Sequence, residues 1–210
     1  MVFALIQTGS VSLTKWTTYL PCRGRYAQSK QRRVRRWLGN SRINIHRLYK
    51  PLIQAALATW EAESLYLCLD TSLFWEEYCL IRLAVVYRGR SIPLAWRVLE
   101  HASASVSADT YQVLLMQSAQ YLPTGVAVIL LADRGFVHTR AMQTMRQLGW
   151  HYRIRLKSDT WLWRPGSGWC QPTSFHLTRG KALCFHNVRL HLQEKYGPVH
   201  VILGRNNING

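Results

Sequence analysis

Two apolar runs that each lead into an aspartate decide the fold: LYLCLD at residues 65–70 and VAVILLAD at residues 126–133. Residues 65–69 predict a buried strand that ends at Asp70. The run at 126–132 contains no polar residue, which is typical of a central strand covered on both faces, and it ends at Asp133. We therefore expect two strands of one sheet, each followed directly by a carboxylate.

The residues around these runs predict the rest of the same sheet. Alternating and helical spacing of apolar residues, with Gly, Pro and Ser at the ends, gives five further elements. In chain order they are strands at 78–88 and 91–99, a helix after Ser107, a helix at 139–148 and a strand at 150–156. The order β-β-β-α-β-α-β predicts an α/β fold with a mixed sheet and helices on its faces.

Segments of a different character flank this core. A charged helix is expected at 27–38 and an apolar one at 43–60, which Pro51 should kink or restart. After residue 158, Trp, Phe and Tyr stand among Gly and Pro turns, with β-like runs at 182–192 and 199–203. We divide the chain into a basic helical segment at 1–62, the core at 63–158 and a β-rich segment at 159–210.

The charge of the chain indicates a polyanionic partner. Twenty-seven Lys and Arg face ten Asp and Glu, which gives a formal net charge of +17. The first 60 residues hold eleven of the basic residues and no acidic one. Nucleic acid is the commonest partner of such a chain, and an anionic membrane surface is the alternative. No apolar stretch reaches membrane-spanning length.

The two aspartates suggest a chemistry for that partner. If their strands are parallel neighbours, Asp70 and Asp133 lie close together in the crevice beyond the strand ends. Two such anions repel each other unless a proton or a cation lies between them, and carboxylate oxygens select Mg²⁺ or Mn²⁺. Two such ions support phosphodiester cleavage and strand transfer. For either residue alone, the alternative is an aspartate that caps a turn or a helix.

The same residues carry a family resemblance. The order of elements resembles the ribonuclease H-like fold. The strings LCLDTS (67–72), LLADRGF (130–136) and YRIRLK (152–157) resemble signature segments of bacterial insertion-sequence DDE transposases. The closest subgroup has a β-rich insertion before its last catalytic helix, which matches the β-rich segment at 159–210.

The resemblance implies a catalytic centre and a missing part. Asp70 and Asp133 would be the first two ligands of a centre with two Mg²⁺ (or Mn²⁺) ions. The family's third acid is a Glu on a helix, within the pattern Tyr-x2-Arg-x3-Glu-x6-Lys, and it has no match here. Asp159 comes too early and Glu194 stands amid β-like runs, so both are interpreted as decoys. We expect a C-terminally truncated chain that lacks the third carboxylate and is inactive alone.

Two groups of basic residues are candidates for DNA contacts, with solvated surface charge as the alternative. In the charged helix they are Lys30, Arg32, Arg33, Arg35 and Arg36, and around the crevice they are Arg134, Arg153, Arg155 and Lys157.

Cysteine, histidine and tryptophan give weaker signals. The five cysteines form no CxxC pair, which favours a reducing cytoplasm; they are Cys22, Cys68, Cys79, Cys170 and Cys184. A zinc site is not expected, because the spacings match no familiar pattern; its ligands would be Cys170, His176, Cys184, His186 and His191. Three tryptophans are candidates for stacking on a flipped DNA base, with hairpin packing as the alternative; they are Trp161, Trp163 and Trp169.

Taken together, the sequence predicts a DNA transposase of the DDE class. It would bind double-stranded DNA, namely the terminal inverted repeats of a mobile element and the target, as a homodimer. It would act at the nucleoid in a bacterial cytoplasm, with no membrane partner. Two alternatives stay open: a non-enzymatic DNA-binding fragment that modulates transposition, and a ribonuclease H-like nuclease.

Overall fold

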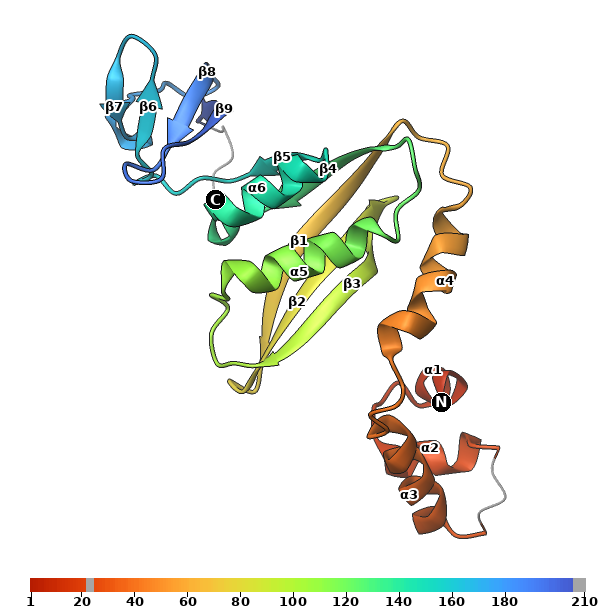
Figure 1. Ribbon diagram of the computed structural model, residues 1–210. Coiled ribbons are helices and arrows are strands. Elements are labelled where there is room, and N and C mark those ends of the chain that lie inside the picture. The colour runs from red at the N-terminus through yellow and green to blue at the C-terminus, as the bar shows by residue number, and fades with distance from the viewer. Residues whose placement is uncertain (22–24, 206–210) are drawn as a thin grey trace. The chain divides into compact units, whose positions relative to one another are not determined.

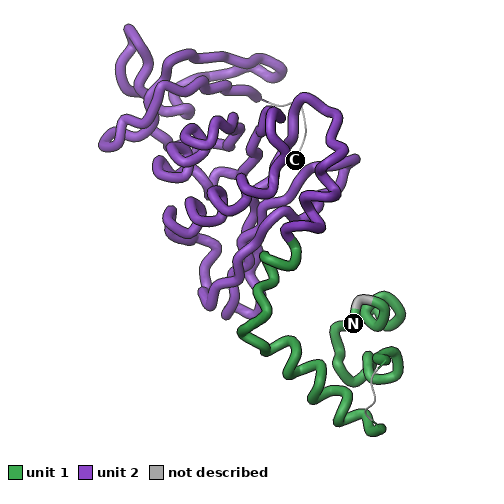
Figure 2. The backbone as a smooth tube through the Cα atoms, turned by 45° about the vertical axis from the view of Figure 1, so that its right-hand side comes forward, with its two compact units in different colours: residues 1–49 green, residues 50–210 purple. Residues whose placement is uncertain are grey.

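The computed structural model describes residues 1–21 and 25–205. Cys22, one of the cysteines expected to be reduced, and residues 206–210 lie outside the described residues. Backbone contacts divide the chain into two compact units, Met1–Tyr49 and Lys50–Gly210 (Figure 2). The division lies within helix α4 (Ile45–Leu57), whereas the sequence prediction ended the basic segment at residue 62.

The first unit is a cluster of short helices around a small core. It contains α1 (Val2–Thr8), α2 (Leu13–Trp16), the 3₁₀ turn η1 (Thr17–Tyr19) and α3 (Ala27–Leu38). Ala4, Trp16 and Val34 are buried together, with Leu13 and Leu20 packed against them. Helix α3 occupies the predicted residues, and Val34 is its one buried side chain. Helix α4 continues through Pro51, so of the two predicted effects of this proline, a kink or a restart, the restart does not occur.

The second unit contains a mixed sheet of five strands (Figure 1). The strands are β1 (Ser64–Phe74), β2 (Tyr78–Tyr87), β3 (Arg90–Glu100), β4 (Ala127–Ala132) and β5 (His151–Ile154). Their order is β3-β2-β1-β4-β5; β1, β2 and β3 are antiparallel, while β4 is parallel to both β1 and β5. This order confirms the predicted α/β fold with a mixed sheet.

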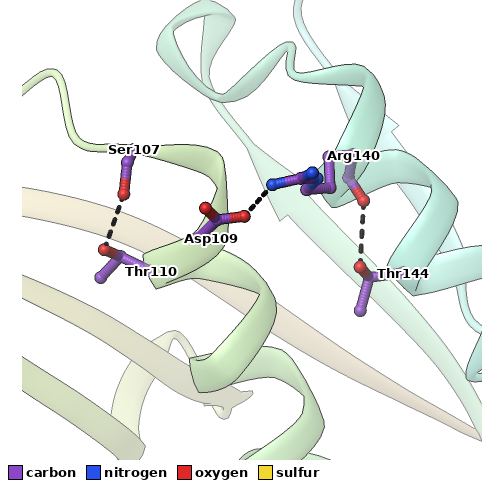
Figure 3. A network of polar contacts seen from close by, with 5 residues as sticks. All are labelled: Ser107, Asp109, Thr110, Arg140 and Thr144. Carbon is purple, nitrogen blue, oxygen red and sulfur yellow. Dashed lines mark hydrogen bonds and ion pairs between the residues drawn. The ribbon is translucent and has the colours of Figure 1, made fainter.

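Helices α5 (Ala108–Ala119) and α6 (Thr139–Gln147) pack against each other and against this sheet (Figure 1). Asp109 forms an ion pair with Arg140, which joins the first turns of the two helices (Figure 3). Tyr111 is 1% exposed and meets the Phe136 ring edge-on at 5.4 Å between ring centroids. This ring contact holds the 3₁₀ turn η2 (Arg134–Phe136), which follows β4 in the chain, against helix α5.

The burial of the central strands differs between the two faces of the sheet. On one face Leu65 and Leu67 of β1 and Leu130 of β4 are fully buried. On the other face, the β4 residues Ile129 and Leu131 are only half-buried. The prediction that the run at 126–132 is covered on both faces was therefore wrong. A run without polar residues is compatible with one covered face as well as with two.

Strand β1 also continues further than the sequence predicted. It does not end at Asp70, because its antiparallel ladder with β2 runs on to the pair Phe74 and Tyr78. Its parallel ladder with β4 ends one residue before Asp70, at the pair Leu69 and Ala132. Asp70 thus lies inside a strand, at the point where one of its two neighbours stops.

The β-rich segment forms a second sheet, with strand order β7-β6-β8-β9 (Figure 1). Its strands are β6 (Leu162–Arg164), β7 (Gly168–Cys170), β8 (Ala182–Leu190) and β9 (Tyr196–Gly204), with a 3₁₀ turn η3 (Pro172–Ser174) between β7 and β8. Leu162 and Val188 are fully buried in it. The hydroxyls of Tyr152 in β5 and Tyr196 in β9 are hydrogen-bonded at 2.9 Å, which ties this sheet to the first.

In the part of the chain that the structure describes, no helix has the length and apolar character needed to cross a membrane.

Candidate active site

The register of the sheet brings Asp70 and Asp133 side by side. Leu69 and Ala132 are opposite each other in the parallel ladder of β1 and β4, so the next residue on each strand is one of the two aspartates. Asp133 keeps an extended backbone, with φ −82° and ψ 173°, which continues the direction of β4. Neighbouring strands are about 4.8 Å apart, and residues in parallel register point to the same face. The two carboxylates therefore share one face at neighbouring positions.

That face is the less covered one. Side chains alternate along a strand, so Asp70 lies on the opposite face from the buried Leu67 and Leu69. The side chains of Asp70 and Asp133 are 54% and 58% exposed. Both carboxylates are thus open to an ion and to a second molecule.

Each carboxylate has an arginine beside it. Arg82 Nη2 lies 3.9 Å from Asp70 Oδ2, and Arg155 Nη1 lies 3.4 Å from Asp133 Oδ1. The backbone N–H of Thr71 also donates to Asp70 Oδ1 at 2.9 Å. The positive charges offset part of the repulsion between the two anions, which allows them to stand together without burial.

The thiol of Cys68 lies on the same face, one pleat before Asp70. Burial raises the pKa of this thiol, and the Asp70 carboxylate raises it further, while Arg82 acts in the opposite direction. Cys68 is therefore a protonated, half-buried neighbour of the pair at neutral pH.

The predicted basic residues around the crevice gather at the end of β5. Arg153, Arg155 and Lys157 are exposed and alternate along the chain, so their side chains leave the same side. All three line a cavity of about 870 Å³ between this segment and the second sheet, to which β9 and its end contribute His200 and Arg205. Asp and Glu are absent from the described residues that line this cavity. Arg134 is exposed directly after Asp133.

The predicted basic residues of α3 divide into two kinds. Arg32, Arg33, Arg35 and Arg36 are exposed, and no acidic residue exists in their unit to pair with them. Lys30 differs, because its Nζ donates to the backbone carbonyl of Thr17 at 3.1 Å. Its ammonium group is used to hold α3 to η1.

Asp159 and Glu194, which the sequence analysis rejected as third ligands, do not join the aspartate pair. Asp159 follows β5 in a turn, where its carbonyl accepts a hydrogen bond from Gln171 at 2.9 Å. Glu194 lies in the turn between β8 and β9 and accepts a hydrogen bond from Thr139. Among the described residues, no three His, Cys, Asp or Glu side chains are grouped closely enough to hold a metal ion.

The weaker candidates are only partly brought together. Cys184 Sγ lies 3.7 Å from His186 Nε2, and His186 Nδ1 lies 3.0 Å from Nδ1 of His200, which the sequence did not single out. Cys170 instead contacts the Leu162 carbonyl. Trp163 and Trp169 are cross-strand partners in the β6–β7 hairpin, which fits the packing interpretation.

Sequence reasoning missed Arg82, the arginine closest to Asp70. Finding it required the register of the β1–β2 hairpin, and the hairpin's turn carries no recognisable signal. Trp75 and Glu76 occupy its positive-φ positions, at 52° and 56°, where Gly or Asn would be typical.

The chain matches no protein-family model and no curated protein sequence. It is similar to solved structures of the catalytic domain of Mos1 mariner transposase, including one with raltegravir and Mn and one with raltegravir and Mg. The sequence identity is 13–14%, the similarity covers 52% of this chain, and the TM-score is 0.34. The chain spans 61–62% of the length of those catalytic domains.

Proposed function

We propose that the second unit is a DDE-type transposase catalytic domain in which Asp70 and Asp133 hold divalent cations against a DNA phosphate. The observation that carries the proposal is the register of Leu69 opposite Ala132, which makes the two aspartates neighbours on one exposed face. Two carboxylates on adjacent strand positions are a donor set that suits Mg²⁺ or Mn²⁺. When bound, the ions would supply activation of a hydroxyl nucleophile and stabilisation of the leaving oxygen.

The residues around the pair would position the DNA. Arg153 and Lys157 lie on either side of Arg155, the arginine that pairs with Asp133. All three line the cavity without acidic residues, so they offer contacts to successive phosphates. The exposed arginines of α3 would supply a second contact area in the first unit. On this proposal the DNA is that of a mobile element's inverted repeats and its target, bound by a homodimer at the nucleoid of a bacterial cytoplasm.

The chain itself provides only two of the three expected ligands. Its ten acidic residues all lie in the described part, and none joins Asp70 and Asp133 in a group of three. Since a missing ligand weakens metal binding and disturbs the geometry of the reacting groups, we propose that the chain alone does not complete cleavage or strand transfer.

A Mn²⁺ titration of the whole chain tests the metal site. The free-ion electron paramagnetic resonance signal measures bound Mn²⁺ for wild type and for Asp70→Asn and Asp133→Asn. We expect each substitution to weaken Mn²⁺ binding by at least about tenfold, since it removes one of two charged ligands. Asp109→Asn is the matched control, because Asp109 is also an exposed aspartate paired with an arginine (Figure 3). Equal Mn²⁺ binding by wild type and the two site variants would reject the proposal.

A second candidate function is DNA binding without catalysis. It is favoured by the first unit, which carries exposed arginines and no acid to neutralise them. Retained DNA binding together with absent Mn²⁺ binding would select this function. The third possibility, a stand-alone nuclease, requires cleavage of arbitrary DNA or RNA that Asp70→Ala and Asp133→Ala abolish.

A further inference from the structure

The aspartate pair is the middle of a row of side chains that crosses the whole five-stranded sheet. Asp70 is opposite Arg82 in the β1–β2 ladder, and Arg82 is opposite Trp96 in the β2–β3 ladder. On the other side, Asp133 follows the pair of Ala132 and Ile154, and the N–H of Arg155 donates to the Ala132 carbonyl at 3.1 Å. The row on one face therefore reads Trp96, Arg82, Asp70, Asp133, Arg155.

The charges in this row are arranged symmetrically. Two adjacent anions stand at the centre and one cation stands outside each of them, so the row is close to neutral. Both ion pairs are exposed to solvent and longer than a hydrogen bond of ideal length. The side chains of Arg82 and Arg155 are 40% and 79% exposed, and their guanidinium nitrogens lie 3.9 and 3.4 Å from the carboxylate oxygens. Exposed pairs at such distances contribute little stability and are readily exchanged for other partners.

A divalent cation bound between the carboxylates would change this balance. It would repel both guanidinium groups and compete for the same oxygens, Asp70 Oδ2 and Asp133 Oδ1. The released guanidinium groups would then flank a strongly positive centre. Arginine binds phosphate with two parallel hydrogen bonds, so each freed side chain suits a DNA backbone phosphate beside the reacting one.

We propose that Arg82 and Arg155 are positioning residues. Without cations they pair with Asp70 and Asp133, and when cations bind to the two carboxylates the arginines bind DNA phosphates instead. Divalent cations and DNA would then strengthen each other's binding. This inference rests on the proposed function, because it takes Asp70 and Asp133 as the cation site. Arg155 has an adjacent place to move to, since it lines the acid-free cavity with Arg153 and Lys157.

The test measures two equilibria on the whole chain and needs no catalysis. Mn²⁺ binding is followed by electron paramagnetic resonance, and binding of a 20-base-pair duplex by fluorescence anisotropy with and without Mn²⁺. For Arg82→Gln and Arg155→Gln we expect tighter Mn²⁺ binding without DNA, by roughly 1.5- to 5-fold, the range of a lost exposed ion pair. We also expect weaker DNA binding and a smaller gain in DNA affinity on adding Mn²⁺.

The controls separate this coupling from a general loss of charge or structure. Arg140→Gln removes a comparable exposed arginine from its pair with Asp109 (Figure 3) and should leave the Mn²⁺ affinity as in wild type. Arg82→Lys keeps the positive charge but cannot form bidentate hydrogen bonds to phosphate. Compared with Arg82→Gln, it should restore the wild-type Mn²⁺ affinity and only part of the DNA affinity.

Three outcomes are decisive. The inference is overturned if the wild-type chain binds Mn²⁺ through its aspartates while Arg82→Gln and Arg155→Gln behave like Arg140→Gln. It is also overturned if either variant weakens Mn²⁺ binding, which would make that arginine a structural support of the pair. Absence of Mn²⁺ binding that depends on Asp70 and Asp133 rejects both this inference and the function on which it rests.

Discussion

Replacing three arginines of α3 by glutamine should remove a large part of the salt dependence of DNA binding. At about 100° per residue, Arg32, Arg35 and Arg36 fall within an arc of about 100° on the helix. That arc is nearly opposite Val34, the residue by which α3 packs on the core of its unit. One DNA backbone can therefore contact all three arginines while the helix keeps its packing.

The magnitude follows from the number of contacts. Each phosphate neutralised adds about 0.9 to the slope of log K against log salt concentration, so three contacts contribute about 2.7. Relative to 1 M salt, where log salt concentration is zero, these three contacts raise the affinity at 0.1 M salt by about 500-fold. The assay is fluorescence anisotropy with a duplex, at four or more salt concentrations, for wild type and the variant with Arg32→Gln, Arg35→Gln and Arg36→Gln.

Lys30 provides the matched control. Its ammonium group donates to the Thr17 carbonyl, on the side of α3 that carries Val34. Lys30→Gln should therefore leave the salt slope unchanged and lower the thermal stability of the first unit. An unchanged slope in the triple variant, or an equal loss of slope in Lys30→Gln, would show that α3 does not present its arginines to DNA in this way.

Two further predictions concern the second sheet. A Cβ on Gly197 would lie 2.6 Å from the Val188 carbonyl oxygen, so Gly197→Ala should lower the free energy of unfolding by about 1–3 kcal/mol. The measurement is thermal unfolding. The control is Gly204→Ala in the same strand, which should change the stability little because the nearest atom to its Cβ would lie 4.0 Å away. Burial and the hydrogen bond with Tyr196 raise the pKa of Tyr152, so the unfolded chain loses this proton first as the pH rises above about 10. Stability should then fall by up to about 1.4 kcal/mol per pH unit, and Tyr152→Phe should reduce that slope; an identical pH profile for the variant would exclude Tyr152 as its source.

The local patterns of the sequence were sufficient for the order of elements. The charged stretch at 27–38 predicted α3, and the apolar runs that lead into Asp70 and Asp133 predicted two core strands. Such patterns reflect interactions within one element, where the period of 3.6 or 2 residues decides which side chains are buried. For the same reason the number of covered faces of β4 was predicted wrongly, since an apolar run does not show what packs on it.

Pairing between strands was decided only by the tertiary structure. That Asp70 and Asp133 are neighbours depends on a parallel register between segments about 60 residues apart in the chain. That Arg82 lies beside Asp70 depends on a hairpin turn formed by Trp75 and Glu76, residue types that do not mark such turns. A shift of one residue in either ladder would place these side chains on different rows or faces, because side chains alternate along a strand. The sequence by itself determined which charged residues the chain has and the strands that carry them; the register, set by packing of the whole sheet, decided which of them meet.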